Sequence, residues 1–324
     1  MTIVNQSSYA RWPYGVVAIC TKDRPDELEM SCSAVHATSP QAPILVIDAS
    51  TTETTRDLCE SLTRRYEPSL HLTYRRAHRP GLARQRNEAV GICRELGAEI
   101  IHFIDDDTEV SAGYFDAIEH RFRQDPTVIG LGGVIVNQPR VDYVTVKSFF
   151  LLWSRRQGCV LKSGRNVMGQ YPDTQANDPV EWLSGCSMSY RMTVFDELMF
   201  DGRLDGYSLG EDYDFGFRLS RTHRLAVEPS ATCVHHMTPV MRGSARVQAC
   251  QRTQATHRWV NEHRGLGMSR AAFWWSAFGD FLLRIGHGML CRDTTSVQEA
   301  LGVVEGVVAI VRNGRHTLRR APKM

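Results

Sequence analysis

The sequence predicts an α/β protein with a mixed, mainly parallel sheet flanked by helices, followed by a C-terminal helical extension. The first observation is an ordinary globular composition, since 42% of the 324 residues are hydrophobic and 23% are charged. The second is an alternation of short apolar runs with amphipathic stretches over residues 14–136, as in βα units. The third is a pair of long, largely apolar helical segments near the C-terminus.

Five apolar runs are predicted to be strands, and the stretches between them to be helices. The strands are Gly15–Cys20, Ile44–Asp48, Leu70–Tyr74, Ile100–Ile104 and Val128–Val136. The helices are Pro25–Ala37, Thr54–Tyr66, Gly81–Leu96 and Ser111–Arg123. Pro25 and Ser111 stand where a first-turn residue and a cap belong, which supports two of these helices.

The rest of the sequence is less regular. Helices are predicted within Arg140–Trp153 and over Gly210–Thr222, Ala271–Leu290 and Val297–Val311, and a strand over Leu225–His236. Between these elements lie a loop over Ser163–Pro179, an apolar segment over Val180–Arg191, and a polar and basic segment over Thr238–Gly265. We expect residues 1–240 to form one domain, with halves at about 14–136 and 137–240. Residues 241–324 would form the helical extension with its basic tail.

Composition excludes several classes of protein. The 38 Lys and Arg nearly balance the 36 Asp and Glu, so no bulk attraction to nucleic acid is expected. The nine cysteines contain no C-x-x-C pair, which favours free thiols in a reducing compartment. The polar N-terminus does not indicate export, so we expect a cytoplasmic protein or one at the inner face of the membrane.

Three carboxylates, Asp105, Asp106 and Asp107, directly follow a predicted strand. Like charges this close are tolerated only with solvent, hydrogen-bond donors or a cation nearby. A divalent ion with oxygen ligands, Mg²⁺ or Mn²⁺, is the natural counter-charge. The alternative is that these acids solvate a loop and help the next helix to start.

Three further clusters leave two interpretations open. Glu211 and Asp212 either support the dipole of a helix start or provide a general base. His235 and His236 end the last strand and are either structural or metal ligands. The basic stretch Arg79–Asn87 is either a solvated helix start or a phosphate site.

In their order along the chain, these motifs resemble glycosyltransferase family 2, the inverting nucleotide-sugar transferases with the GT-A, Rossmann-like fold. The resemblance covers roughly residues 14–239, and its specificity comes from the order, because each motif alone is weak. The matching motifs are Thr21–Arg24, Asp48, Gly81–Asn87, Asp105–Asp107, Gly185–Arg191, Glu211–Asp212 and the late histidine.

The resemblance implies a donor site in residues 14–136. Asp48 would contact the nucleoside, and Arg86 would lie near the base or the diphosphate. Asp105 would lie near the ribose, while Thr21 and Asp106 complete the expected donor-binding set.

The resemblance also implies metal and catalytic groups. Asp107 would bind the metal together with His236, or with His235 if the register shifts by one residue. Asp212 matches the catalytic base, and Glu211 would orient it or meet the acceptor. The junction between donor sugar and acceptor would be lined by Trp182, Gly185 and Cys186.

The implied function is metal-dependent, inverting transfer of a sugar from a nucleoside-diphosphate donor to an acceptor hydroxyl. UDP is the favoured nucleotide, Mn²⁺ or Mg²⁺ the cofactor, and a lipid-linked or polysaccharide glycan the acceptor. One alternative is a nucleotidyltransferase, but it would be expected to carry a glycine-rich loop where the chain reads Thr21–Pro25. A non-catalytic sugar- or nucleotide-binding relative is the other alternative.

The segment Ala271–Leu290 contains charged Asp280 and Arg284, so it is not expected to span a bilayer. Its apolar stripe consists of Trp274, Phe278, Phe281, Ile285 and Met289. Such a stripe either packs on protein, including a second subunit of a homodimer, or lies on an anionic membrane surface.

Overall fold

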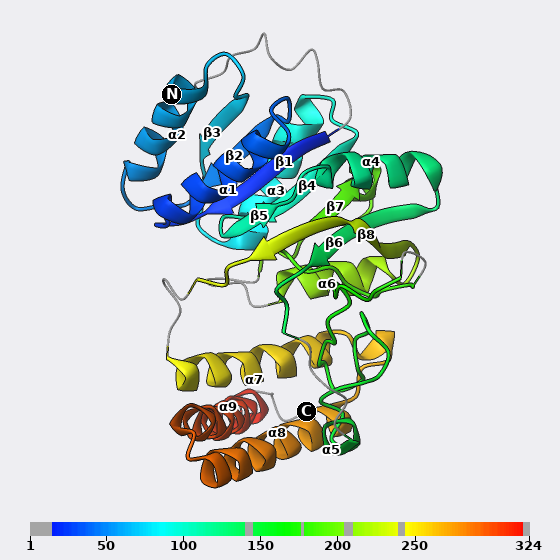
Figure 1. Ribbon diagram of the computed structural model, residues 1–324. Coiled ribbons are helices and arrows are strands. Elements are labelled where there is room, and N and C mark those ends of the chain that lie inside the picture. Colours follow the sequence, from blue (N-terminus) through cyan, green and yellow to red (C-terminus); the bar gives the residue numbers. More distant parts are fainter. Residues whose placement is uncertain (1–14, 140–144, 176–177, 204–209, 239–243, 320–324) are drawn as a thin grey trace. The chain divides into compact units, whose positions relative to one another are not determined.

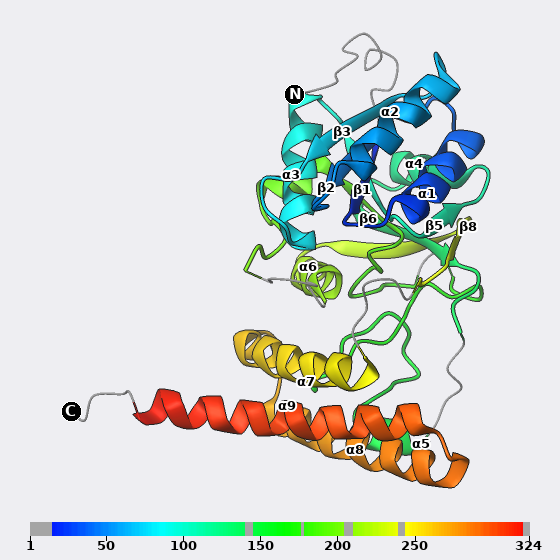
Figure 2. The same cartoon turned by 90° about the vertical axis from the view of Figure 1, so that its left-hand side faces the viewer.

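A computed structural model describes residues 15–139, 145–175, 178–203, 210–238 and 244–319. The chain divides into two compact units. The first contains residues 1–140 and 168–238, and the second contains residues 141–167 and 239–324. Segment 141–167 is therefore grouped with the C-terminal helices. Figures 1 and 2 show the elements of each unit.

The first unit is built on one eight-stranded sheet with the order β3-β2-β1-β4-β7-β6-β8-β5. Its strands are β1 Gly15–Thr21, β2 Ile44–Asp48, β3 Leu72–Arg76, β4 Ile100–Asp105, β5 Thr108–Val110, β6 Val128–Ile135, β7 Met188–Arg191 and β8 Arg224–His235. Neighbours β1, β2, β3 and β4 are parallel, whereas β7 runs antiparallel to both β4 and β6. Because β8 is parallel to β6, it runs in the same direction as β4.

Helices cover both faces of this sheet. On one face lie α1 Pro25–Thr38, α2 Thr54–Tyr66 and α4 Tyr114–Gln124, packed on alternate strand residues such as Val17 and Ile19. On the other lie α3 Leu82–Glu95, the 3₁₀ helix η2 Met192–Asp196 and α6 Glu211–Leu219, packed on Val16 and Ala18. Figure 2 shows α1 and α4 on one side of the sheet and α3 on the other.

The second unit is helical. Its elements are α5 Thr145–Phe149, α7 Ala245–Glu262, the 3₁₀ helix η3 Arg264–Leu266, α8 Arg270–Cys291 and α9 Thr294–Arg319. Glycines bring α7 and α9 close together, since a Cβ on Gly302 would lie 2.2 Å from the carbonyl oxygen of Arg246. A Cβ on Gly306 would lie 2.7 Å from the Thr253 Cβ. By length and composition alone, α9 could cross a membrane over Thr294–Arg312, and 22% of that window is buried.

Most sequence predictions agree with these elements. The predicted bounds of β2 and α2 are those observed, whereas β3 begins at Leu72, two residues later than predicted. Within the described part of Arg140–Trp153, the helix is limited to α5, and residues 140–144 lie outside the description. Helix α7 was not predicted. The basic tail from Arg315 onward lies outside the described side chains.

Candidate active site

The carboxyl ends of four strands meet at one edge of the sheet, because β1, β2, β4 and β8 run in the same direction. Helix α6 precedes β8 by a short turn and runs back along the sheet, so its N-terminus lies at this same edge. In open α/β sheets this edge is where ligands bind. The predicted site residues come from these strand and helix ends.

Two acids and one histidine form a cluster at this edge. Ligand atoms of Asp105, Asp107 and His235 all lie within 4.8 Å of one another. The turn after β4 leads into β5, which pairs with the end of β8 so that Thr108 lies opposite His235. Two carboxylates and an imidazole are ligands that suit Mg²⁺ or Mn²⁺. These three residues could therefore hold a divalent ion.

The two histidines point to different places. His235 Nε2 lies 3.1 Å from Asp107 Oδ1, whereas His236 is exposed and its Nε2 lies 3.3 Å from Glu109 Oε1. Adjacent residues at the end of a strand point to opposite sides, which separates them. Of the two histidines that the sequence left open, the structure brings His235, the stated alternative to His236, within 4.8 Å of both acids.

Hydrogen bonds set the charges of the Asp107–His235 pair. Burial by itself would raise the pKa of Asp107, but hydrogen bonds from His235 and Arg24 outweigh it and hold the pKa below its ordinary value. Burial would lower the pKa of His235, but its hydrogen bond to Asp107 outweighs it and raises the pKa to about 11. The pair is therefore ionised at neutral pH, and a cation bound here would displace the imidazole proton.

Asp106 turns away from this cluster. Its carboxylate accepts hydrogen bonds from Thr21 Oγ1 at 2.7 Å and from Arg24 Nη1 at 2.6 Å. Burial raises the pKa of Asp106 to about 7, although Arg24 and Thr21 oppose the rise. Arg24 also donates to Asp107 Oδ2 at 2.8 Å. Arg24 thus serves as a fixed counter-charge for residues Asp105–Asp107, which we call the acidic turn. The motif Thr21–Arg24 was identified from the sequence, but this role of Arg24 was not predicted.

Arg86 joins the acidic turn to the start of α6. Its Nη1 donates to Glu211 Oε1, and its Nη2 lies 3.3 Å from Asp105 Oδ1. The guanidinium is 2% exposed and lies beside the rings of Phe103 and Phe200. Burial raises the pKa of Glu211 above its ordinary value, and Arg86 limits the rise. Arg86 was expected near the base or diphosphate, and the structure places its charge in these internal ion pairs.

Asp212 lies in the first turn of α6, which follows Gly210 in the left-handed conformation (φ 89°). Its Oδ2 accepts from the backbone N of Gly185 at 3.0 Å, and its Oδ1 accepts from the backbone N of Tyr213 at 2.8 Å. Burial raises the pKa of Asp212, against the opposing effect of Arg86. A carboxylate with a raised pKa, held in place by backbone donors, has the properties required of a general base.

The segment before β7 connects these groups. Gly185 donates to Asp212 and accepts from Arg86 Nη2 through its carbonyl at 3.4 Å. The same Arg86 nitrogen lies 3.3 Å from Asp105 Oδ1 of the acid–histidine cluster, and the next residue along the chain, Cys186, is buried. Trp182 is buried against α6, where a Cβ on Gly216 would lie 2.7 Å from its Cα. The predicted base and the acid–histidine cluster are therefore linked through Gly185 and Arg86.

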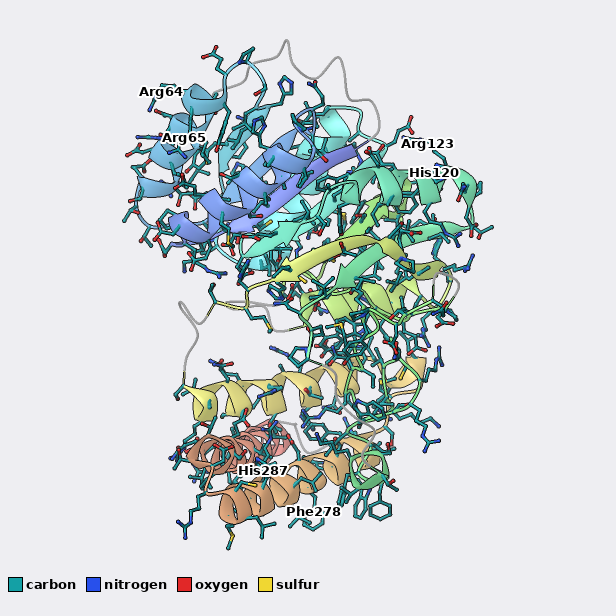
Figure 3. All side chains as sticks on the ribbon, in the orientation of Figure 1. Arg64, Arg65, His120, Arg123, Phe278 and His287 are labelled. Atoms are coloured by element: carbon teal, nitrogen blue, oxygen red, sulfur yellow. The ribbon has the colours of Figure 1, made fainter. Side chains whose placement is uncertain are left out.

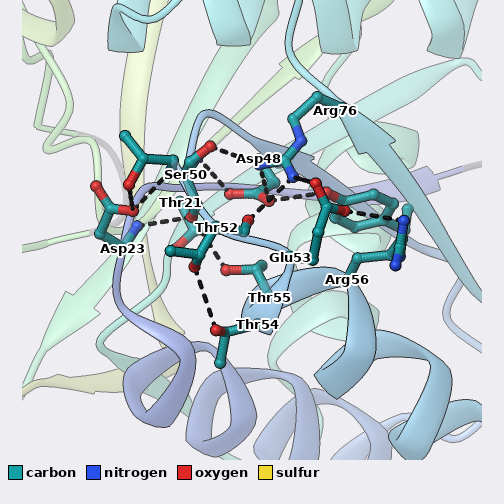
Figure 4. A network of polar contacts seen from close by, with 12 residues as sticks. Thr21, Asp23, Asp48, Ser50, Thr52, Glu53, Thr54, Thr55, Arg56 and Arg76 are labelled. Carbon is teal, nitrogen blue, oxygen red and sulfur yellow. Dashed lines mark hydrogen bonds and ion pairs between the residues drawn. The ribbon is translucent and has the colours of Figure 1, made fainter.

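Asp48 is enclosed by its neighbours at the end of β2. Its carboxylate accepts hydrogen bonds from Ser50 N at 2.7 Å, Tyr74 Oη at 2.8 Å and Arg76 Nη1 at 3.3 Å. Figure 4 shows Asp48 among these contacts, with Arg76 pointing toward it. The side chain is 0% exposed, so the contact to a nucleoside expected of Asp48 is not accessible in this conformation. Asp48 instead holds Arg76, which is one-third exposed.

The sequence model described as glycosyl transferase family 2 matches residues 16–198, more than half of the chain. The chain belongs to this family. The match begins in β1 and contains the acidic turn, Arg86 and the Gly185–Cys186 segment of this glycosyltransferase. No curated protein matches the chain significantly.

Solved structures of glycosyltransferases are similar to the chain in fold. Mannosyltransferase PcManGT from Pyrobaculum calidifontis, in complex with GDP-Man and Mn²⁺, is 16% identical with a TM-score of 0.52, and the match covers 97% of this chain and 83% of that one. GalNAc-T7 with UDP, GalNAc and Mn²⁺ is 15% identical with a TM-score of 0.51, covering 70% and 44%. S. aureus TarS is 13% identical with a TM-score of 0.50, covering 85% and 43%.

These similarities confirm the predicted fold class, a GT-A fold with a mixed sheet flanked by helices. The chain spans less than half of the GalNAc-T7 and TarS chains, and most of the PcManGT chain. At these levels of identity the comparison concerns the fold, and the roles of individual residues depend on the geometry described above.

Proposed function

We propose that this glycosyltransferase moves a sugar from a nucleoside-diphosphate donor to an acceptor hydroxyl, with inversion at the anomeric carbon and with a divalent metal as cofactor. The observation that carries the proposal is the link between Asp212 and the acid–histidine cluster. The backbone N–H of Gly185 donates to Asp212, and Arg86 donates both to the Gly185 carbonyl and to Asp105. A base and a metal site joined in this way can act on opposite sides of the anomeric carbon, the base on the attacking hydroxyl and the metal on the leaving diphosphate.

Asp105, Asp107 and His235 would hold the metal, and their two carboxylates and one imidazole fit Mn²⁺ or Mg²⁺. Such an ion, when bound, supplies positive charge for the diphosphate that leaves the sugar. Asp48 and Arg76 lie at the same edge of the sheet, at the ends of β2 and β3. We place the nucleoside near Arg76, since Asp48 itself is enclosed.

Asp212 would act as the general base. Its carboxylate accepts the proton of the acceptor hydroxyl as the oxygen attacks the anomeric carbon, and the bond from that carbon to the diphosphate oxygen breaks. Backbone donors from Gly185 and Tyr213 hold the carboxylate in place for this step. Base assistance of this kind contributes about 10²–10⁴-fold to the rate. Glu211, paired with Arg86, would keep the first turn of α6 in position.

The donor is proposed to be a UDP-sugar, with GDP-sugars as the next candidate. GalNAc-T7 was solved with UDP and PcManGT with GDP-Man, and both structures contain Mn²⁺. For the acceptor we propose a lipid-linked or polysaccharide glycan.

Slow hydrolysis of the donor tests the proposal without knowledge of the acceptor. The full chain is incubated with Mn²⁺ and a panel of UDP-, GDP- and dTDP-sugars, and the free sugar and nucleoside diphosphate are measured. Release of both products from one donor class, and its loss on chelation, would support the proposal. If no sugar is released from any donor, or if release is unaffected by chelation, the proposed metal-dependent transfer is wrong.

Asp212→Asn tests the base. It should keep the affinity for the donor and lose at least about 100-fold in turnover, since the proton acceptor is removed. The matched control is Asp116→Asn, an exposed acid in the first turn of α4, which should change neither. Turnover of Asp212→Asn close to that of the unchanged protein would remove Asp212 from this role.

A further inference from the structure

Helix α8 presents an apolar face to its surroundings. Trp275, Phe278, Leu282 and Met289 follow one another at spacings of three, four and seven residues, which places them on one side of the helix. Their exposed fractions are 39%, 51%, 39% and 74%. Figure 3 shows Phe278 projecting outward from the ribbon of α8.

The two charged residues in the middle of α8, Asp280 and Arg284, pair with each other and with other residues of the second unit instead. Asp280 is buried, and it accepts hydrogen bonds from Arg165 at 2.6 Å and from Arg284 at 2.8 Å. Arg284 also donates to Glu299 of α9. A helix that faces water carries its charges outside and its aromatic residues inside. The side of α8 that carries Trp275 and Phe278 shows the reverse, so this side is suited to a surface less polar than water.

The aromatic face continues onto α5. The ring of Phe149 is 63% exposed and its centroid lies 5.2 Å from that of Trp275. The indole of Trp275 donates to the carbonyl oxygen of Phe149 at 2.8 Å. This contact fixes the two rings together and satisfies the indole N–H. We call Phe149, Trp275, Phe278, Leu282 and Met289 the aromatic face.

The charge of the second unit selects the kind of surface. Residues 141–167 and 239–324 contain 18 Lys and Arg against 6 Asp and Glu, whereas the first unit contains 20 against 30. Lys147 precedes Phe149 by two residues, and the exposed Arg270 and Arg292 stand at the two ends of α8. Basic residues at the borders of an apolar face are typical of helices that bind anionic lipid.

We propose that the second unit binds the surface of an anionic lipid bilayer through the aromatic face. The aromatic and aliphatic side chains would enter the boundary between headgroups and acyl chains, and the basic residues would contact the anionic headgroups. Helix α9 would stay with the protein, because its Gly302 and Gly306 pack directly on α7. This proposal is independent of the proposed catalytic function.

Flotation of the full chain with vesicles tests the proposal. One set of vesicles contains phosphatidylcholine alone, and the other also contains phosphatidylglycerol. We expect binding to the anionic vesicles, weakened by added salt. The substitutions Phe149→Ser, Phe278→Ser and Met289→Ser together should weaken that binding by about tenfold or more. The control Val247→Ser with Leu266→Ser changes two exposed apolar residues of the same unit outside the aromatic face and should bind as before.

Quenching of tryptophan fluorescence by brominated lipid is a second measurement that uses the unchanged protein, so the test does not depend on the variant folding well. Trp275 should be quenched by brominated anionic vesicles. Absence of both flotation and quenching at low salt would overturn the proposal, as would a folded triple variant that floats like the unchanged protein. If the unchanged chain is a stable dimer that the triple substitution separates, the aromatic face binds a second copy and the proposal is wrong.

Discussion

Arg86→Met should destabilise the first unit strongly. The methionine keeps an unbranched apolar side chain beside Phe103 and Phe200, but it removes the counter-charge of Glu211, whose side chain is 6% exposed. Removing one partner of a buried ion pair costs about 3–5 kcal/mol, because the other charge stays buried and unpaired. We therefore expect the free energy of unfolding to fall by about 3 kcal/mol or more.

A double-mutant cycle isolates the pair. Glu211→Gln removes the other charge, and the double variant leaves neither group unpaired, so it should be more stable than the Arg86→Met variant. The coupling free energy should be at least about 2 kcal/mol, within the range found for residues in direct contact. Urea unfolding followed by circular dichroism measures all four proteins.

Arg94→Met is the matched control for this cycle. Arg94 lies on the same helix and pairs with Asp196 at 2.9 Å, but both side chains are exposed. An exposed pair contributes at most about 1 kcal/mol. The reasoning is refuted if Arg86→Met costs no more than Arg94→Met, or if the two changes in the cycle simply add.

Three other predictions concern the site and the second unit. His235→Ala should weaken Mn²⁺ binding measured by calorimetry at least about tenfold, whereas His236→Ala should not; equal effects would contradict the assignment of the ligand. Gly185→Ala should lower the rate of donor hydrolysis, because the new Cβ would lie 2.5 Å from an Arg86 nitrogen. The control Gly265→Ala should leave this rate unchanged, because nothing lies within 4 Å of its Cβ. Full activity of Gly185→Ala would show that the Gly185 segment can shift. Burial would raise the pKa of Asp280, but its partners Arg165 and Arg284 outweigh burial and lower the pKa. The ionised carboxylate therefore stabilises the fold at pH values above the ordinary carboxyl pKa of about 4, and this stabilisation is lost as the pH falls. Urea unfolding of Asp280→Asn should therefore depend less on pH below about 5 than that of the unchanged protein, and identical pH profiles would argue against the pair.

The part of the fold that the sequence predicts best is the part with regular apolar patterns. The buried run Ile44–Asp48 and the following helix Thr54–Tyr66 were predicted with their observed bounds. Helix α7 was not predicted, because it contacts α9 through small residues such as Ala249 and Thr253, which give no apolar period. Strand β3 was placed two residues early, since it ends in two arginines that look like loop residues.

The sequence singled out the acidic residues of the candidate site, but it predicted few of their hydrogen-bond partners. The order of motifs singled out Asp105, Asp107 and Asp212, but it implied a place near the ribose for Asp105, which the structure groups with Asp107 and His235. The partners that set their charges could not be predicted, because Arg24 meets Asp106 across 82 residues and Arg86 meets Glu211 across 125 residues. The choice between His235 and His236 depends on which side of the sheet each residue faces at the end of β8, and this follows from strand pairing with β5.

The opposite charge excess of the two units has a practical consequence. A net charge of +2 suggests a protein that interacts weakly with any ion-exchange resin. Because acidic residues are in excess in one unit and basic residues in the other, the molecule should instead be retained by both anion and cation exchangers at low ionic strength. The same imbalance makes separate molecules attract one another in dilute buffer, so solubility should rise when salt is added.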